Sequence, residues 1–181
     1  MSRVRGGISS VALMIVLAMP AHAALFMWVP GIAGEVTLPD RTGWILIDAA
    51  SLGHSFSLPM DATRRMQVKV EPIVVKRRMD GNSPLFAQLV ATGVAMKDLK
   101  LESAIQGPQG SQPMYRVRLT NVLVSSYAVQ LAGDQIPMEE LELVFESISW
   151  IGYKQDKEGK WGPASATCWD FATSKACQPS F

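Results

Sequence analysis

Histidine and cysteine are scarce in this chain: its 181 residues contain two of each. A structural zinc site needs about four nitrogen or sulfur ligands, and these residues are too few to supply one once His22 leaves with the N-terminal segment described below. A catalytic triad would need His54, but no Gly-x-Ser-x-Gly nucleophile turn is present. An acid–base pair among Glu139, Glu140, Glu142 and Glu146, working with His54, stays open as a hydrolase site.

The chain also lacks an excess of positive or negative charge, and it has no long apolar run. Charged residues make up 18% of the chain and the net charge is +1, so no overall field attracts nucleic acid. The phosphate-binding motifs Gly-x-x-x-x-Gly-Lys-Ser/Thr and Gly-x-Gly-x-x-Gly do not occur. No apolar run reaches the roughly 20 residues that a membrane-spanning helix needs. We therefore expect a protein that is not an enzyme, with no cofactor, no metal, no nucleic-acid partner and no stable membrane insertion.

One stretch of the chain does concentrate positive charge. Six basic residues lie within residues 64–78, without interleaved aromatic residues on which single-stranded nucleic acid could stack. We interpret the stretch as a solvated loop or strand edge whose charge discourages wrong pairing. An anion-binding patch is the alternative.

The first 23 residues have the three parts of a secretory signal peptide. Arg3 and Arg5 supply the positive charge, residues 11–19 are apolar, and the last three residues are Ala-His-Ala, a typical cleavage site. We expect cleavage between Ala23 and Ala24 and export to the periplasm or the extracellular space; an uncleaved anchor is the alternative. Cleavage removes two arginines and no acidic residue, so residues 24–181 would form a single domain with a net charge of −1.

The rest of the sequence is mainly β in pattern. Short apolar or alternating runs between turn residues predict strands near 25–29, 44–48, 53–58, 73–76, 99–104, 115–124, 141–150 and 166–171, with 66–70 a further candidate. Within 141–150 the alternation changes phase, which suggests a bulge. Many short strands with one helix point to a β-barrel or sandwich with a packed helix.

The single helix is predicted over about residues 84–92. Ser83 is a suitable N-cap, Pro84 suits the first helical position, and Gly93 can adopt the left-handed conformation that ends a helix. Four apolar residues are expected to form the buried stripe: Leu85, Phe86, Leu89 and Val90.

Cys168 and Cys177 are nine residues apart near the C-terminus. In an oxidising compartment two such cysteines can close a short loop. We expect a disulfide that holds the tail against the last strand and contributes roughly 2–3 kcal/mol in the loop-entropy model. The alternative is two unrelated buried thiols.

Several short motifs occur in a fixed order along residues 25–171. They are Phe-Met-Trp-Val-Pro-Gly-Ile-Ala-Gly-Glu at 26–35, Gly-Trp-Ile at 43–45, Asp-Gly-Asn-Ser-Pro-Leu-Phe to Thr-Gly at 80–93, Val-Leu-Val-Ser-Ser-Tyr at 122–127, Pro-Met-Glu-Glu at 137–140 and Cys-Trp-Asp-Phe at 168–171. In these motifs the chain resembles the haemolysin-coregulated protein (Hcp) family, the tube protein of type VI secretion systems.

The resemblance implies a two-sheet β-barrel with one packed helix. It also implies that six copies form a ring, that rings stack into a hollow tube, and that the partners are type VI effectors or sheath and baseplate components. Ser51 would face the lumen, although this chain has Ala-Ser-Leu-Gly where the family has Trp-Ser-Trp-Gly. The signal peptide and the cysteine pair are not general features of the family, so an exported Hcp-like binding module that no longer forms tubes is the alternative function.

Overall fold

The structure is a computed structural model that describes residues 23–57, 67–107 and 110–181. The predicted signal peptide therefore lies outside the described residues, except for Ala23. Within the described residues, no helix is long and apolar enough to span a membrane.

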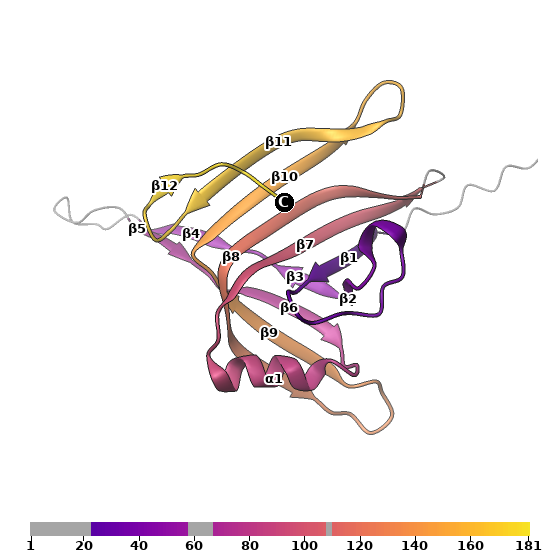
Figure 1. Ribbon diagram of the computed structural model, residues 1–181, viewed down its shortest axis with the longest axis vertical. Helices are drawn as coiled ribbons and strands as arrows, with labels where there is room; N and C mark the ends of the chain where they lie inside the picture. Colours follow the sequence, from indigo (N-terminus) through magenta and orange to yellow (C-terminus); the bar gives the residue numbers. More distant parts are fainter. Residues whose placement is uncertain (1–22, 58–66, 108–109) are drawn as a thin grey trace, which may run out of the picture.

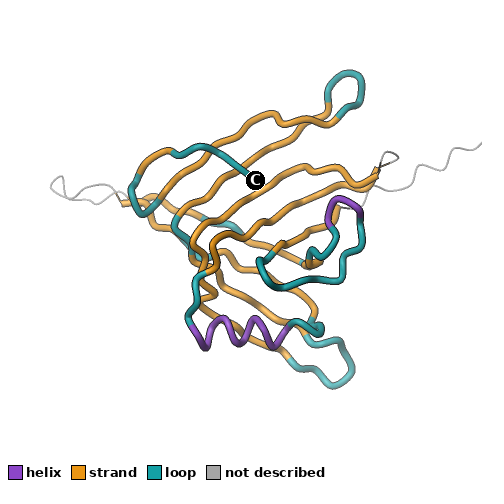
Figure 2. Tube along the Cα trace, viewed as in Figure 1, coloured by secondary structure: helices purple, strands orange, loops and turns teal. Residues whose placement is uncertain are grey.

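Strands dominate the fold, as the sequence pattern predicts (Figures 1 and 2). They are β1 (Ala23–Trp28), β2 (Ile45–Ile47), β3 (Ala49–Ser51), β4 (His54–Ser57), β5 (Gln67–Val70), β6 (Ile73–Arg78), β7 (Met96–Gly107), β8 (Gly110–Gln130), β9 (Met138–Val144), β10 (Ser147–Gln155), β11 (Trp161–Asp170) and β12 (Lys175–Ala176). A short 3-10 helix, η1 (Pro39–Arg41), lies between β1 and β2.

Two sheets enclose the core. The first has the strand order β12-β11-β10-β8-β7-β1-β2, and the second joins β3, β6, β9 and the end of β8. Strand β8 belongs to both: residues before 121 pair with β10 and residues from 123 pair with β9. The bend between them falls at Asn121, whose positive φ of 51° is one that asparagine tolerates better than most residues.

The two sheets are also connected at a second place, between β2 and β3. Strand β2 pairs with β1, whereas β3, one residue further along, pairs with β6. The Asp48 N–H between them donates to the Lys76 carbonyl at 2.9 Å. Within the described residues, the two-sheet arrangement with one α-helix is thus confirmed, although no continuous ladder closes the sheets into a barrel. Strands β4 and β5 form a separate two-stranded sheet.

Helix α1 (Ser83–Thr92) lies against the strands at one end of the molecule (Figure 1). Phe86 is buried in the core, and Gly93 ends the helix in the left-handed conformation while donating to the Leu89 carbonyl at 3.0 Å. Two details of the prediction are wrong. Asn82, not Ser83, occupies the N-cap position, and the Ser83 hydroxyl accepts a hydrogen bond from the Asp80 N–H. Leu85 is 39% exposed.

The strand predicted over 141–150 is two strands. Residues 145–146 carry the chain from β9 in the second sheet to β10 in the first, and the Glu146 N–H donates to the Thr120 carbonyl at 3.0 Å. When the chain passes from one sheet to the other, the alternation of buried and exposed residues changes phase, as it does at a bulge. The predicted bulge was therefore wrong, although the phase change was real. Strands β3 and β12 were not predicted at all; each has at most three residues.

The hydrophobic core lies between the two sheets. It is built from alternate residues of the strands together with Phe86 of α1, and Val75, Leu119, Leu141 and Ile148 have no exposed surface. This core fixes the positions of the sheet edges and of α1, where the surfaces described next are found.

Candidate functional site

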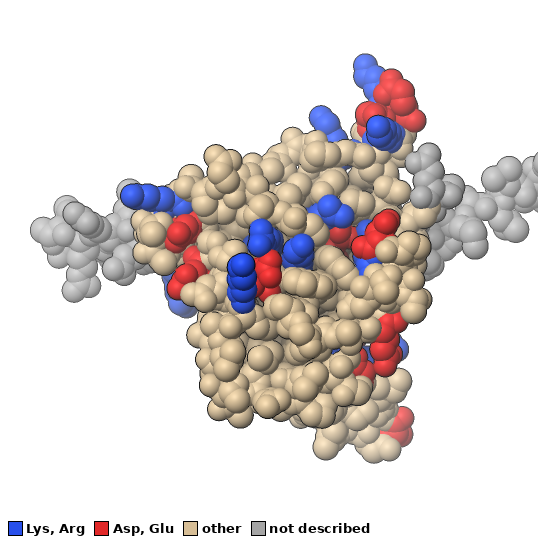
Figure 3. All heavy atoms as spheres, in the orientation of Figure 1, with Lys and Arg blue, Asp and Glu red and all other residues tan. Residues whose placement is uncertain are grey.

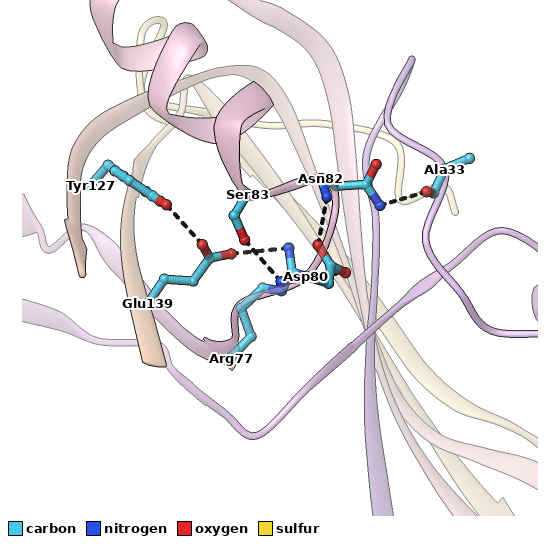
Figure 4. A network of polar contacts seen from close by, with 7 residues as sticks. All are labelled: Ala33, Arg77, Asp80, Asn82, Ser83, Tyr127 and Glu139. Atoms are coloured by element: carbon cyan, nitrogen blue, oxygen red, sulfur yellow. Dashed lines mark hydrogen bonds and ion pairs between the residues drawn. The ribbon is translucent and has the colours of Figure 1, made fainter. Parts of the chain in front are cut away.

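A buried ionic cluster anchors α1 to the second sheet (Figure 4). Arg77 and Glu139 are directly paired residues of β6 and β9, and Arg77 Nη1 lies 3.0 Å from Glu139 Oε1. The two atoms are not aligned for a hydrogen bond, so we treat the contact as an ion pair. Arg77 Nη2 also pairs with Asp80, and its guanidinium lies 5.2 Å from the centre of the Phe86 ring.

The same cluster shapes the turn that starts α1. The Asn82 N–H donates to Asp80 Oδ1 at 2.8 Å, and the Asn82 side chain donates to the Ala33 carbonyl at 2.8 Å, which ties this turn to the loop after β1. Burial would raise the pKa of Asp80, but the Arg77 guanidinium and the Asn82 N–H hold it below its usual value. Asp80 is therefore charged at neutral pH, as the ion pair requires.

Tyr127 forms a hydrogen bond with the second carboxylate oxygen of Glu139. The Tyr127 hydroxyl donates to Glu139 Oε2 at 2.9 Å, and burial together with this bond to a carboxylate raises the pKa of Tyr127 to about 12. The phenol therefore keeps its proton, and with it the bond, throughout the physiological range.

The prediction that the basic stretch at residues 64–78 is solvated is therefore wrong for Arg77. Arg77 is 1% exposed, although its neighbours Lys76 and Arg78 do face solvent. A signal was available in the sequence, because Arg77 keeps the period-2 register of the buried residues Ile73 and Val75. Arg64 and Arg65 of this stretch lie outside the described residues.

Helix α1 presents an uncharged surface to solvent. No Asp, Glu, Lys or Arg occurs from residue 81 to residue 96, and Leu85 and Val94 are 39% and 56% exposed. The loop between β8 and β9, at the same end of the molecule, adds Leu131 and Ile136, both more than half exposed, and one exposed charged residue, Asp134. Figure 3 shows this end largely free of charged side chains, whereas they gather over the first sheet. We call Leu85, Val94, Leu131 and Ile136 the helix surface.

Strand β11 presents a second uncharged surface, at the far edge of the first sheet. Its residues 161–168 pair with β10 on one side, and within the described residues β12 pairs only with Trp169 and Asp170 on the other. Residues 163–167 are exposed, and no charge occurs from Trp161 to Trp169. Long uncharged edges usually pair with another strand, and here only Pro163 and one bulge interrupt the edge. We call residues 161–168 the β11 edge.

The residues singled out from the sequence are scattered over the molecule. Ser51 is an exposed residue of β3. His54 is also exposed, with its ring edge-on to Trp150 at 5.3 Å between centroids. The predicted cleavage junction, Ala23 and Ala24, lies at the start of β1.

The side chains proposed for chemistry do not form a recognisable site. Glu139 is occupied by Arg77 and Tyr127, and Glu140 pairs with Lys76 at 2.8 Å. Among the described residues, no group of three or more His, Cys, Asp and Glu side chains could hold a metal ion.

Cys168 and Cys177 form a disulfide, with 4.9 Å between their Cα atoms. The bond joins β11 to the residue directly after β12, and the Cys177 N–H also donates to the Cys168 carbonyl at 3.2 Å. The end of the chain is thereby held close to the edge strand of the first sheet.

Residues 26–151 match a protein-family model described as type VI secretion system effector, Hcp. The chain belongs to the Hcp family. No curated protein sequence matches it significantly. The match covers the motifs from the first strand to β10, so the interpretation of those motifs as Hcp-like is confirmed.

Solved Hcp structures share the fold. A type six secretion system protein has a TM-score of 0.76 at 21% identity over 86% of this chain and all of the other. Hcp1 from Salmonella typhimurium has 0.66 at 16% identity over 86% and 99%. The secreted protein Hcp3 from Pseudomonas aeruginosa has 0.52 at 14% identity over 84% and 99%. At these identities the likeness shows the fold alone.

The Hcp motif at 30–35 has a physical explanation in this structure. Gly34 lies where a Cβ atom would come within 2.2 Å of the Trp44 carbonyl oxygen, so any side chain would push these two backbone segments apart. Its N–H donates to the Gly43 carbonyl at 2.8 Å. The Gly-Glu pair of the motif and the Gly-Trp-Ile motif are therefore two sides of one close backbone contact.

Proposed function

We propose that this chain is a ring-forming tube subunit of a type VI secretion system, with no catalytic activity of its own. Membership of a structural tube family supports the role in general. The observation that carries the proposal is the pair of unlike, mainly apolar or uncharged surfaces, the helix surface and the β11 edge, at opposite ends of the molecule (Figure 1).

A closed ring needs two different patches on each copy. In a head-to-tail contact, one patch of a subunit meets another patch of the next, and the ring closes when the rotation returns to its start. We propose that the β11 edge of one copy packs against the helix surface of its neighbour. The near-neutral net charge of the mature chain keeps repulsion between copies weak. The number six comes from the family resemblance, as do the effectors and the sheath or baseplate components as partners.

Light scattering coupled to size-exclusion chromatography tests this function. We expect the mature chain at high micromolar concentration to elute with a mass six times that of one copy, and negative-stain microscopy to show rings with a central hole. A strict monomer across that range would exclude the tube subunit and favour an exported Hcp-like binding module.

We also propose that the chain is exported and begins at Ala24 in its mature form. Cleavage after Ala23 would leave Ala24 to Trp28 of β1 paired with β7, so the first sheet keeps this strand. Mass spectrometry of the protein made in a bacterial host should find Ala24 at the N-terminus in the periplasmic or secreted fraction. An intact N-terminus on cytosolic protein would contradict the export proposal without affecting the ring.

A further inference from the structure

The last four residues of the chain lie across the outer face of the first sheet. From Cys177 the tail returns over β10 and β8, and the C-terminus lies over the middle of the sheet (Figure 1). The Ser180 N–H donates to the Ser149 hydroxyl of β10 at 3.4 Å, and the Ser180 hydroxyl accepts from Arg118 of β8 at 2.7 Å. Phe181 follows Ser180 and lies near Arg116 of β8 and Lys100 of β7.

Phe181 occupies a cationic and aromatic site there. The Arg116 guanidinium lies 4.6 Å and the Lys100 ammonium 5.0 Å from the centre of its ring, and the Trp44 ring is 6.1 Å away. Cations over an aromatic face are attracted by the negative potential of the ring, most strongly where water is excluded. Phe181 itself is partly buried.

The walls of this site are held independently of the tail. Arg116 Nε pairs with Glu102 at 2.6 Å, and its Nη1 donates to the Tyr153 hydroxyl at 2.8 Å. Lys100 also lies 5.2 Å from the centre of the Trp28 ring. These partners of Arg116 and Lys100 belong to the sheet and not to the tail, so they do not depend on Phe181.

The disulfide sets how far Phe181 can move. With Cys177 bonded to Cys168, Phe181 lies four residues beyond the bond, a stretch that spans at most about 14 Å. Without the bond, residues 172–181 can extend to about 35 Å. A short tether raises the effective concentration of Phe181 at its own site.

We propose that Lys100, Arg116 and Trp44 form a binding site for an aromatic side chain, and that the Cys168–Cys177 disulfide holds the chain's own Phe181 in it. A dithiol reductant opens the site. It gives up two electrons and two protons, the S–S bond breaks into two thiols, and the reductant becomes a disulfide. The family match ends at residue 151, so the tail and its disulfide lie beyond the part of the chain that defines the family.

Carboxypeptidase A, which removes C-terminal aromatic residues, tests the proposal. The protein is kept at a concentration where it is a monomer, so the result does not depend on ring formation, and loss of Phe181 is followed by mass spectrometry. We expect release from the oxidised chain to be on the order of 10- to 100-fold slower than from the chain reduced with dithiothreitol, as the loop-entropy model gives for a loop of this length. The Cys168→Ser/Cys177→Ser variant should release Phe181 quickly under both conditions.

Two further variants separate the site from the disulfide. Lys100→Met should speed release from the oxidised chain several-fold, because it removes one cation from the ring, whereas Lys97→Met, an exposed lysine of the same strand, should not. Circular dichroism checks that each variant is folded. Equal release from oxidised and reduced wild-type chains would overturn the role of the disulfide. Release from the oxidised chain as fast as from a free Gln-Pro-Ser-Phe peptide, or no effect of Lys100→Met, would overturn the site.

Discussion

Replacing Arg77 by methionine is expected to lower the free energy of unfolding by about 3–5 kcal/mol, the usual cost of breaking a buried ion pair from one side. The change leaves Glu139, whose side chain has no exposed surface, without its counter-charge, and it removes the cation from the Phe86 ring. Denaturant unfolding followed by circular dichroism measures the loss. All variants are compared at one protein concentration, because assembly adds to apparent stability.

The neighbouring residue supplies a matched control. The Arg78 side chain is 65% exposed and lies 3.7 Å from Asp48, so Arg78→Met should cost less than about 1 kcal/mol. Adding Glu139→Met to Arg77→Met should recover part of the stability, because the buried carboxylate is removed as well. Equal losses for Arg77→Met and Arg78→Met would show that the buried cluster does not anchor α1.

Charged substitutions on either proposed surface are expected to abolish rings completely. Ala164→Lys adds a charge to the exposed β11 edge, and Leu85→Glu adds one to the helix surface. Each leaves one surface of every copy unable to pair, so each variant alone should elute as a monomer. Ala49→Lys, at an exposed position of β3 outside both surfaces, should still form rings.

Mixing the two damaged variants makes the test specific. An Ala164→Lys copy keeps its helix surface and a Leu85→Glu copy keeps its β11 edge, so one contact between them remains possible. Light scattering of an equimolar mixture should therefore show dimers and nothing larger, while neither variant alone forms dimers. A mixture that stays monomeric, or rings formed by either variant alone, would contradict the pairing of these two surfaces.

The sequence pattern was most informative where local rules decide the structure. Period-2 alternation located most of the longer strands, and Pro84 with Gly93 located α1 to within one residue, because helix ends depend on neighbouring residues. The ordered motifs identified the family. Strands of three residues or fewer carry too little pattern to be seen, which is why β3 and β12 were missed.

The buried cluster shows what local reasoning could not provide. Arg77 and Glu139 each keep the register of buried residues in their own strand, but sequence alone does not say that β6 pairs with β9 and puts them side by side. Without a known partner, a charged residue at a strand end is more often solvated. The site of Phe181 is a similar case, because it combines residues of β7, β8 and the tail with Trp44 before β2.

Cross-linking between the two surfaces tests the central claim most directly. Both native cysteines are paired, so Leu85→Cys and Ala164→Cys can be introduced together and joined with a short bismaleimide. The ring predicts a ladder of covalent species from dimer upward that ends at six copies, and it predicts no ladder when either new cysteine is present alone. A double-cysteine chain that stays monomeric, or a ladder that continues past six without stopping, would contradict a closed ring built from the β11 edge and the helix surface.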